Sequence, residues 1–191
     1  MKKRILSSLG ILLAVVIGIF VFSSSSIAVE FSADMILKQR GETLTGKVYV
    51  KGDKIRQEFL QRGEKQVIIL RMDKNVVWNL MPEEKIYMEM SSLGGAANDP
   101  KIEQKIKDMA EKRYLGKEKV SGYVCEKYQY IYHDKSTGTV TQWFSKKLNY
   151  PIKAEHKAPS HYMFTEYKNI KEKKVLDSLF EIPAGYRKLS M

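Results

Sequence analysis

Apolar and polar residues alternate along residues 46–90 in short runs. In the first run Val48 and Val50 share one side of the alternation. A period of two places successive side chains on opposite faces of a strand, and an amphipathic helix cannot use it. Residues 67–72 are almost continuously apolar, which indicates a strand covered on both faces. The pattern predicts a series of short strands, each with at least one buried face.

Turn-forming residues separate these runs. Residues 51–54 place Gly52 where a tight hairpin requires positive φ, and Pro82 fits the second position of a type I turn. Short polar connections also stand at residues 62–64 and 73–75. Strands joined by loops this short lie antiparallel beside each other, so the runs predict an antiparallel meander.

Strand patterns continue on both sides of the meander. They cover residues 29–40, 115–120, 122–132, 140–145, 152–156 and 162–169, and a short apolar segment follows at 176–183. The total is about ten to eleven strands, with no internal repeat and no second domain boundary.

A different spacing follows residue 99. Pro100 suits the first turn of a helix, and Ile102, Ile106 and Met109 then recur at helical spacing with charged residues opposite. These residues predict one amphipathic helix over residues 100–114. It either plugs the core or acts as a movable lid over a cavity, with Ile102, Ile106 and Met109 as the lid residues.

One helix is too little to cover a flat sheet of this size on either face. The predicted fold class is therefore mainly β (α+β). We expect a curled antiparallel sheet that forms a half-barrel of about ten to eleven strands, with the inserted amphipathic helix as its lid.

A curled sheet with an apolar concave face encloses either a packed core or a ligand. If a ligand binds there, the alternation selects ten candidate residues for the cavity lining. They are Val48, Val50, Ile55, Phe59, Ile69, Trp78, Leu80, Ile86, Met88 and Met90. Their methionines suit a pocket for variable apolar shapes, although methionine also fills ordinary cores. The selection depends on register, because a slip of one residue turns the opposite set inward.

The N-terminus has the layout of a secretory signal. Three basic residues precede the apolar run 5–22, and Ser26 and Ala28 supply the small residues of a cleavage site. Cleavage after Ala28 would leave residues 29–191 as a single domain, and the alternative is an uncleaved membrane anchor. Both alternatives predict an exported, periplasmic or membrane-tethered domain.

The chain is basic, with a formal net charge of +11 that falls to +8 without residues 1–28. In an exported protein such a surplus either favours an anionic membrane or polysaccharide surface or serves solubility alone. Nucleic acid is a poor partner in that compartment.

Little in the sequence points to catalysis. Cys125 is the single cysteine, so it forms no internal disulfide, and its strand pattern favours a buried apolar role over an intermolecular disulfide. His156 and His161 flank a predicted turn and could hold a metal with Glu155, but exposed loop histidines are more often incidental. Catalytic and phosphate-binding motifs are absent. We expect no enzyme activity, catalytic residue, cofactor or metal site.

Several sequence motifs together carry a family resemblance. Besides the export signal they are YVKGDKIRQEF, RMDKNVVWNLMPEEKIYMEM, GYVCEKY, TQWFSKKLNYPIKAE and LFEIPAGY. The chain resembles the outer-membrane lipoprotein-sorting superfamily, most closely an uncharacterised branch of LolA/LppX-like domains. The resemblance covers nearly all of residues 29–191. It implies an eleven-stranded half-barrel closed by helices, with an apolar cavity for lipid or lipoprotein acyl chains.

Two functions remain open at this point. The first is a non-catalytic periplasmic carrier or binder of lipid or lipoprotein acyl chains. The second is an envelope sensor or interaction module that grips a partner protein with the same curved sheet.

Overall fold

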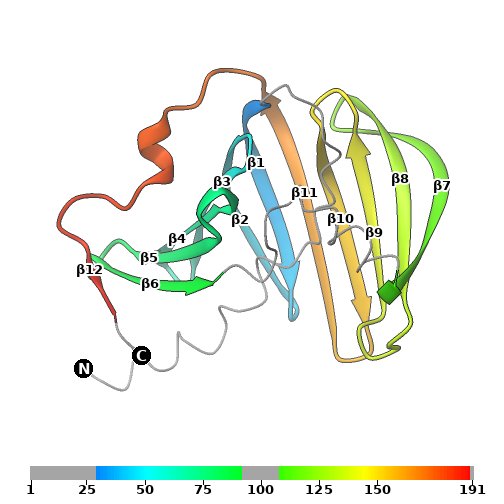
Figure 1. Cartoon of the computed structure of the whole chain (residues 1–191), viewed down its shortest axis with the longest axis horizontal. Coiled ribbons are helices and arrows are strands. Elements are labelled where there is room, and N and C mark those ends of the chain that lie inside the picture. The colour runs from blue at the N-terminus through cyan, green and yellow to red at the C-terminus, as the bar shows by residue number, and fades with distance from the viewer. Residues whose placement is uncertain (1–28, 92–107, 190–191) are drawn as a thin grey trace.

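A computed structural model describes residues 29–91 and 108–189. They form one curled, unclosed sheet of twelve strands in the order β12-β6-β5-β4-β3-β2-β1-β11-β10-β9-β8-β7 (Figure 1). Neighbouring strands are antiparallel except β12 and β6, which are parallel. The predicted fold class, a mainly β half-barrel, is confirmed.

Most strands are joined by short turns. The bounds are β1 Glu30–Gln39, β2 Glu42–Lys51, β3 Lys54–Gln61, β4 Glu64–Arg71, β5 Val76–Met81, β6 Ile86–Ser91, β7 Ala110–Val120, β8 Tyr123–Tyr132, β9 Thr139–Ser145, β10 Tyr150–Ala158, β11 His161–Lys171 and β12 Arg187–Lys188. Two short 3₁₀ turns, η2 at Met72–Lys74 and η3 at Asp177–Phe180, complete the described elements.

The predicted turns lie where the sequence places them. Gly52 has a φ of +56° in the two-residue turn between β2 and β3, and Gly63 has a φ of +82° between β3 and β4. Asn75, in the left-handed conformation, ends η2. A different constraint acts on Gly46, because a Cβ there would lie 2.0 Å from the carbonyl oxygen of Glu58 on β3.

The predicted helix is wrong over its last five residues. Of the residues predicted to be helical, only Asp108 and Met109 are both described and helical, and β7 begins at Ala110. From there β7 pairs with β8 as far as Val120, so cross-strand pairing overrides the helical spacing. The predicted helical positions before residue 108 lie outside the described residues.

The register assigns the side chains of the meander to two faces. Directly opposed residues share a face, and one such row is Val50, Ile55, Leu70, Val77 and Met90. We call this side the inner face. Most of its apolar side chains join those of β8–β11 in one buried cluster, so the sheet curls around it, and those next to β12 form a smaller cluster of their own.

Three predicted lining residues lie on the other side of the sheet. Ile69 and Trp78 are directly opposed, and Leu80 shares their face, which is opposite to that of Leu70. The expectation that all ten residues share one face is therefore wrong for Ile69, Trp78 and Leu80. In the continuous apolar run of β4 the alternation does not reveal which residues point inward, and the error passes to β5 through their pairing.

Residues 172–189, which we call the strap, leave the end of β11 and return across the sheet to β6 (Figure 1). Val175 and Phe180 of the strap are buried in one cluster with Ile69, Trp78 and Leu80. The strap thus covers the outer face of the meander, and the predicted short apolar segment at 176–183 contributes to this cover.

Candidate functional site

The inner face of the meander is largely apolar and buried. The seven remaining predicted lining residues, Val48, Val50, Ile55, Phe59, Ile86, Met88 and Met90, lie on this face. Ile68, Leu70 and Val77 lie there as well and are missing from the sequence-based selection. They are apolar in the sequence, but both faces of β4 and β5 carry apolar residues, so the sequence leaves two equivalent choices of facing.

Amide side chains interrupt this apolar surface. Gln57 and Asn79 are the cross-strand neighbours of Ile68 on its two sides, and Gln66 is directly opposite Phe59. Asn79 is 0% exposed and Gln66 is 4% exposed. Both side-chain polar atoms of Asn79, and the amide oxygens of Gln57 and Gln66, have no hydrogen-bond partner among the described residues. Each buried polar atom without a hydrogen-bond partner lowers the stability of the fold by about 1–3 kcal/mol. The meander contains several such atoms, and nothing among the described residues offsets their desolvation.

Aromatic residues join the two halves of the sheet on the inner face. Phe31 of β1 meets Tyr150 of β10 edge-on, with ring centroids 5.3 Å apart, and Tyr167 of β11 lies 6.0 Å from Tyr150. Gln57 donates its amide to the Tyr167 hydroxyl at 3.5 Å. Burial raises the pKa of Tyr150, so this phenol stays neutral. The aromatic contact between the two halves of the sheet is therefore uncharged.

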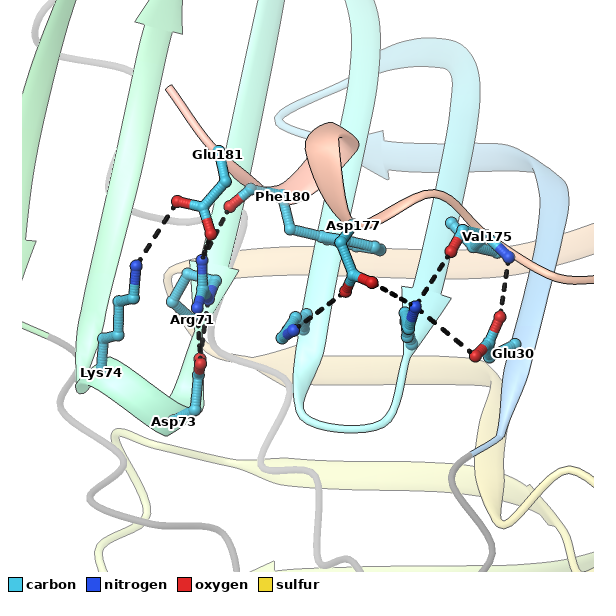
Figure 2. Close-up of polar contacts among 10 residues, drawn as sticks. Glu30, Arg71, Asp73, Lys74, Val175, Asp177, Phe180 and Glu181 are labelled. Carbon is cyan, nitrogen blue, oxygen red and sulfur yellow. Dashed lines mark hydrogen bonds and ion pairs between the residues drawn. The ribbon is translucent and has the colours of Figure 1, made fainter. Parts of the chain in front are cut away.

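Arg71 binds the strap to the outer face (Figure 2). Its guanidinium donates to both carboxylate oxygens of Asp73, at 2.8 and 2.6 Å, and to the Phe180 carbonyl oxygen at 3.1 Å. It also pairs with Glu181. The hydrogen bond to Arg71 lowers the pKa of Asp73, although burial opposes it. The charge of Arg71, whose side chain is only 5% exposed, is thus compensated by two carboxylates.

A second polar group fixes the start of the strap. Lys51 donates to Asp177 at 2.7 Å and to the Val175 carbonyl oxygen at 3.2 Å, and Lys54 donates to Asp177 at 3.1 Å. The Val175 amide donates to Glu30 at 2.7 Å (Figure 2). Backbone and side chains of the strap are therefore both held, which gives it a defined position on the sheet.

The predicted lid residues do not form a described site. Ile102 and Ile106 lie outside the described residues. Met109 is described and is 56% exposed. Its carbonyl oxygen accepts a hydrogen bond from the amide of His133 at 2.9 Å, just before β7 begins.

Only two of the three residues considered for metal binding come together. His156 and His161 do meet across their hairpin, with 3.3 Å between Nδ1 of His156 and Nε2 of His161. Glu155 instead accepts from Tyr162 and pairs with Lys157. Among residues 29–91 and 108–189, no group of three potential metal ligands comes together.

Cys125 is fully buried, as its strand pattern predicts. Burial raises the pKa of its thiol to about 11. Only a small fraction is therefore thiolate at neutral pH, which argues against a nucleophilic role.

Within the described part of the chain, no helix has the length and apolar character needed to cross a membrane.

The curled, unclosed sheet and its apolar inner face place the protein in the class of β half-barrels. Residues 32–149 match the family described as "Domain of unknown function (DUF4412)", and the chain belongs to this family. The expected resemblance to an uncharacterised branch of the LolA/LppX-like superfamily is confirmed at the level of the fold. No curated protein matches the chain by sequence.

Solved structures share the fold at low sequence identity. An uncharacterized conserved protein from Thermus thermophilus is similar at 13% identity and a TM-score of 0.60, over 85% of this chain and 91% of that one. MucB in the MucA/MucB complex of Pseudomonas aeruginosa is similar at 12% identity and a TM-score of 0.57. That match covers 85% of this chain but only 58% of the other. The lipoprotein LppX from Mycobacterium tuberculosis matches at 10% identity and a TM-score of 0.44, over 76% of this chain and 89% of that one.

Proposed function

We propose that this protein is an exported, non-catalytic binder of lipid or lipoprotein acyl chains, and that the inner face of its half-barrel holds the chain. The observation that carries the proposal is the set of unpaired polar atoms, both of Asn79 and the amide oxygens of Gln57 and Gln66, within a largely apolar buried face. A polar linkage of a bound lipid would accept a hydrogen bond from the Asn79 amide, and a linkage with an N–H group would also donate to one of the unpaired oxygens.

The apolar part of the face provides most of the binding energy. Each methylene transferred from water contributes about 0.8 kcal/mol, so an acyl chain of roughly fifteen methylenes gains on the order of 12 kcal/mol before ordering costs. Met88 and Met90 on β6 add flexible side chains that adapt to chains of different shape. The inner face thus needs no charged group to hold an acyl chain.

The amides narrow the chemistry of the ligand. Asn79 offers one acceptor and two donors, and the amide oxygens of Gln57 and Gln66 are acceptors. An ester accepts only, whereas an amide linkage both accepts and donates. Both linkages are neutral, so they can enter a buried site without the penalty of burying a charge. We therefore expect an acyl chain attached through an ester or amide.

Co-purified lipid provides the direct test. The protein purified from cells should release lipid into an organic extract, detected by mass spectrometry, and the emptied protein should bind a fluorescent fatty-acid ester as a probe. Extracts without lipid, together with no probe binding, would refute the proposal.

Variants locate the binding site. Met88→Glu places a charge on the inner face and should abolish probe binding, whereas Leu60→Glu, at a residue that is 61% exposed on β3, should leave it unchanged. Circular dichroism checks that both variants are folded. If Met88→Glu unfolds, Asn79→Val provides the second measurement, described below.

A partner-binding module is the second candidate function. It is favoured by the similarity to MucB, whose structure is solved in complex with MucA, and by the position of β7 at a free edge of the described sheet. An exposed edge strand can pair with an extended peptide. Recovery of one defined envelope protein with the purified chain, without lipid, would favour this function over the first.

A further inference from the structure

A separate cavity lies at the end of the sheet where β7 turns into β8. We call it the corner pocket. It has a volume of about 670 Å³ and lies beside the β7–β8 and β9–β10 turns. The lining residues that matter here are Lys117, Tyr123, Val124, Glu126, Lys146 and Lys147. The proposed acyl-chain site uses none of them.

The pocket and its rim carry an excess of positive charge. Lys117 is directly opposite Glu126, and Lys119 is directly opposite Val124, so both lysines share one face of the β7–β8 hairpin. Neither lysine has a carboxylate oxygen within 4.0 Å among the described residues. Lys146 already pairs with Glu126 at 2.7 Å.

Lys147 adds a further ammonium group to the pocket. It pairs with Glu172 at 2.6 Å, and Glu172 also accepts from the Tyr123 hydroxyl at 2.8 Å. Glu172 stands between Lys171 and Lys173, both of which are exposed. The carboxylates at this corner are therefore engaged, and the cations outnumber them.

Exposed apolar side chains accompany these lysines. Val124 is 65% exposed although it lies within a strand, and Leu115 and Tyr114 on β7 are 47% and 54% exposed. A single exposed apolar residue needs no explanation. Here the apolar groups project from the same hairpin as Lys117 and Lys119.

We propose that the corner pocket docks the protein on an anionic bilayer. Lipid phosphates lie against Lys117, Lys119 and Lys146, while Val124 enters the interface between headgroups and acyl chains. Lysine is a mobile point charge on an apolar stem, which suits a fluid array of phosphates better than the fixed geometry of one acidic peptide. This docking is independent of the proposed acyl-chain binding.

Vesicle binding by the chain as purified from cells tests the proposal. Vesicles of phosphatidylcholine mixed with phosphatidylglycerol should bind the protein more tightly than vesicles of phosphatidylcholine alone. Lys117→Gln and Lys119→Gln should each weaken binding to the mixed vesicles about fivefold. Lys135→Gln is the matched control, because this exposed lysine lies in the turn at the opposite end of β8, about 30 Å away, and should have no effect.

The apolar contribution has its own control. Val124→Ser should weaken vesicle binding, whereas Leu60→Ser, similarly exposed on β3, should not. Hydrogen exchange in residues 117–126 should slow when mixed vesicles are added. This measurement detects contact at the corner pocket itself, so it is separate from any vesicle binding by the N-terminal residues.

Three results would overturn the proposal. One is an equal effect of Lys135→Gln and Lys117→Gln, which would mean attraction by net charge alone. Another is unchanged hydrogen exchange in residues 117–126. The third is protection of these residues by soluble glycerol phosphate or by an acidic partner protein but not by mixed vesicles.

Discussion

Arg71 donates a hydrogen bond of 3.1 Å to the carbonyl oxygen of Phe180, a residue 109 positions later in the chain. The Phe180 side chain is fully buried beside Ile69 and Leu80. One guanidinium therefore fixes the position at which an apolar anchor enters the outer face. Arg71 thereby holds the middle of the strap, whereas Lys51, Lys54 and Glu30 hold its start.

Replacing Arg71 should loosen the strap. Arg71→Met leaves Asp73 and the Phe180 carbonyl oxygen without their donor. It should lower the free energy of unfolding by about 2–3 kcal/mol, less than for a fully buried pair because Glu181 is half exposed. Urea unfolding measures the loss. Lys74→Met, which removes a longer 3.4 Å contact to Glu181, should change stability by less than about 0.5 kcal/mol, and an equal loss in both variants would contradict the role of Arg71.

The same cluster should make the fold sensitive to acid. Arg71 lowers the pKa of Asp73 below its unfolded value near 3.8. The resulting stability is therefore complete above that value and is lost as the pH falls through the folded pKa. Urea unfolding between about pH 5 and pH 2 should show a shallower fall in stability for Asp73→Asn than for the natural chain. Parallel curves would show that the pair contributes nothing.

Asn79→Val should affect stability and binding in opposite directions. Removing two unpaired buried polar atoms should raise the free energy of unfolding of the lipid-free protein by about 1 kcal/mol. The same change removes partners for an ester or amide, so affinity for an acyl lipid with that linkage should fall about tenfold. Thermal unfolding and lipid titration measure the two effects. Higher stability with unchanged affinity would remove Asn79 from the ligand site but leave acyl binding intact.

Gly46→Ala should be among the more damaging single-methyl additions in the sheet. Its Cβ would lie 2.0 Å from the Glu58 carbonyl oxygen and 3.0 Å from the Phe59 Cβ, so β2 and β3 would have to separate. We expect a loss of about 2–3 kcal/mol in urea unfolding. Gly63→Ala, in a turn with open space and a positive φ, should cost only about 1 kcal/mol from backbone strain. A larger loss at Gly63 would contradict the assigned contact.

The Cys125 thiol should be inert in the folded protein. Its burial and its pKa of about 11 predict slow reaction with a disulfide reagent at neutral pH and fast reaction in urea. A colorimetric thiol assay follows both rates. A disulfide-linked dimer on a non-reducing gel would contradict the burial of this residue.

The alternation in residues 46–90 was sufficient to predict the strands and their hairpins, because side-chain facing and turn chemistry are local properties. The sequence predicts the wrong face of the sheet for Ile69, Trp78 and Leu80, because both sides of β4 and β5 are buried. The covering element is the strap, more than 90 residues away, and a local pattern carries no information about it. For the same reason the sequence alone does not indicate that Arg71 binds the carbonyl oxygen of Phe180.

The unpaired amides and the corner pocket were also beyond sequence reasoning. Gln57 and Asn79 have ordinary polar positions in their strands, and only the register places them beside Ile68 on the inner face. Ala110 shows the opposite limit. It falls within the helix that the spacing of the preceding residues predicts, but pairing with Tyr132 in β8 decides its conformation.

The strand order has a consequence for how the molecule assembles. β1–β6 and β7–β11 are each a meander of sequence neighbours, and the ladder between β1 and β11, in which Met35 is opposite Tyr167, joins the two. Each meander can form from nearby residues alone, but that single seam requires closing a loop of more than 120 residues. Seam formation should therefore limit the folding rate.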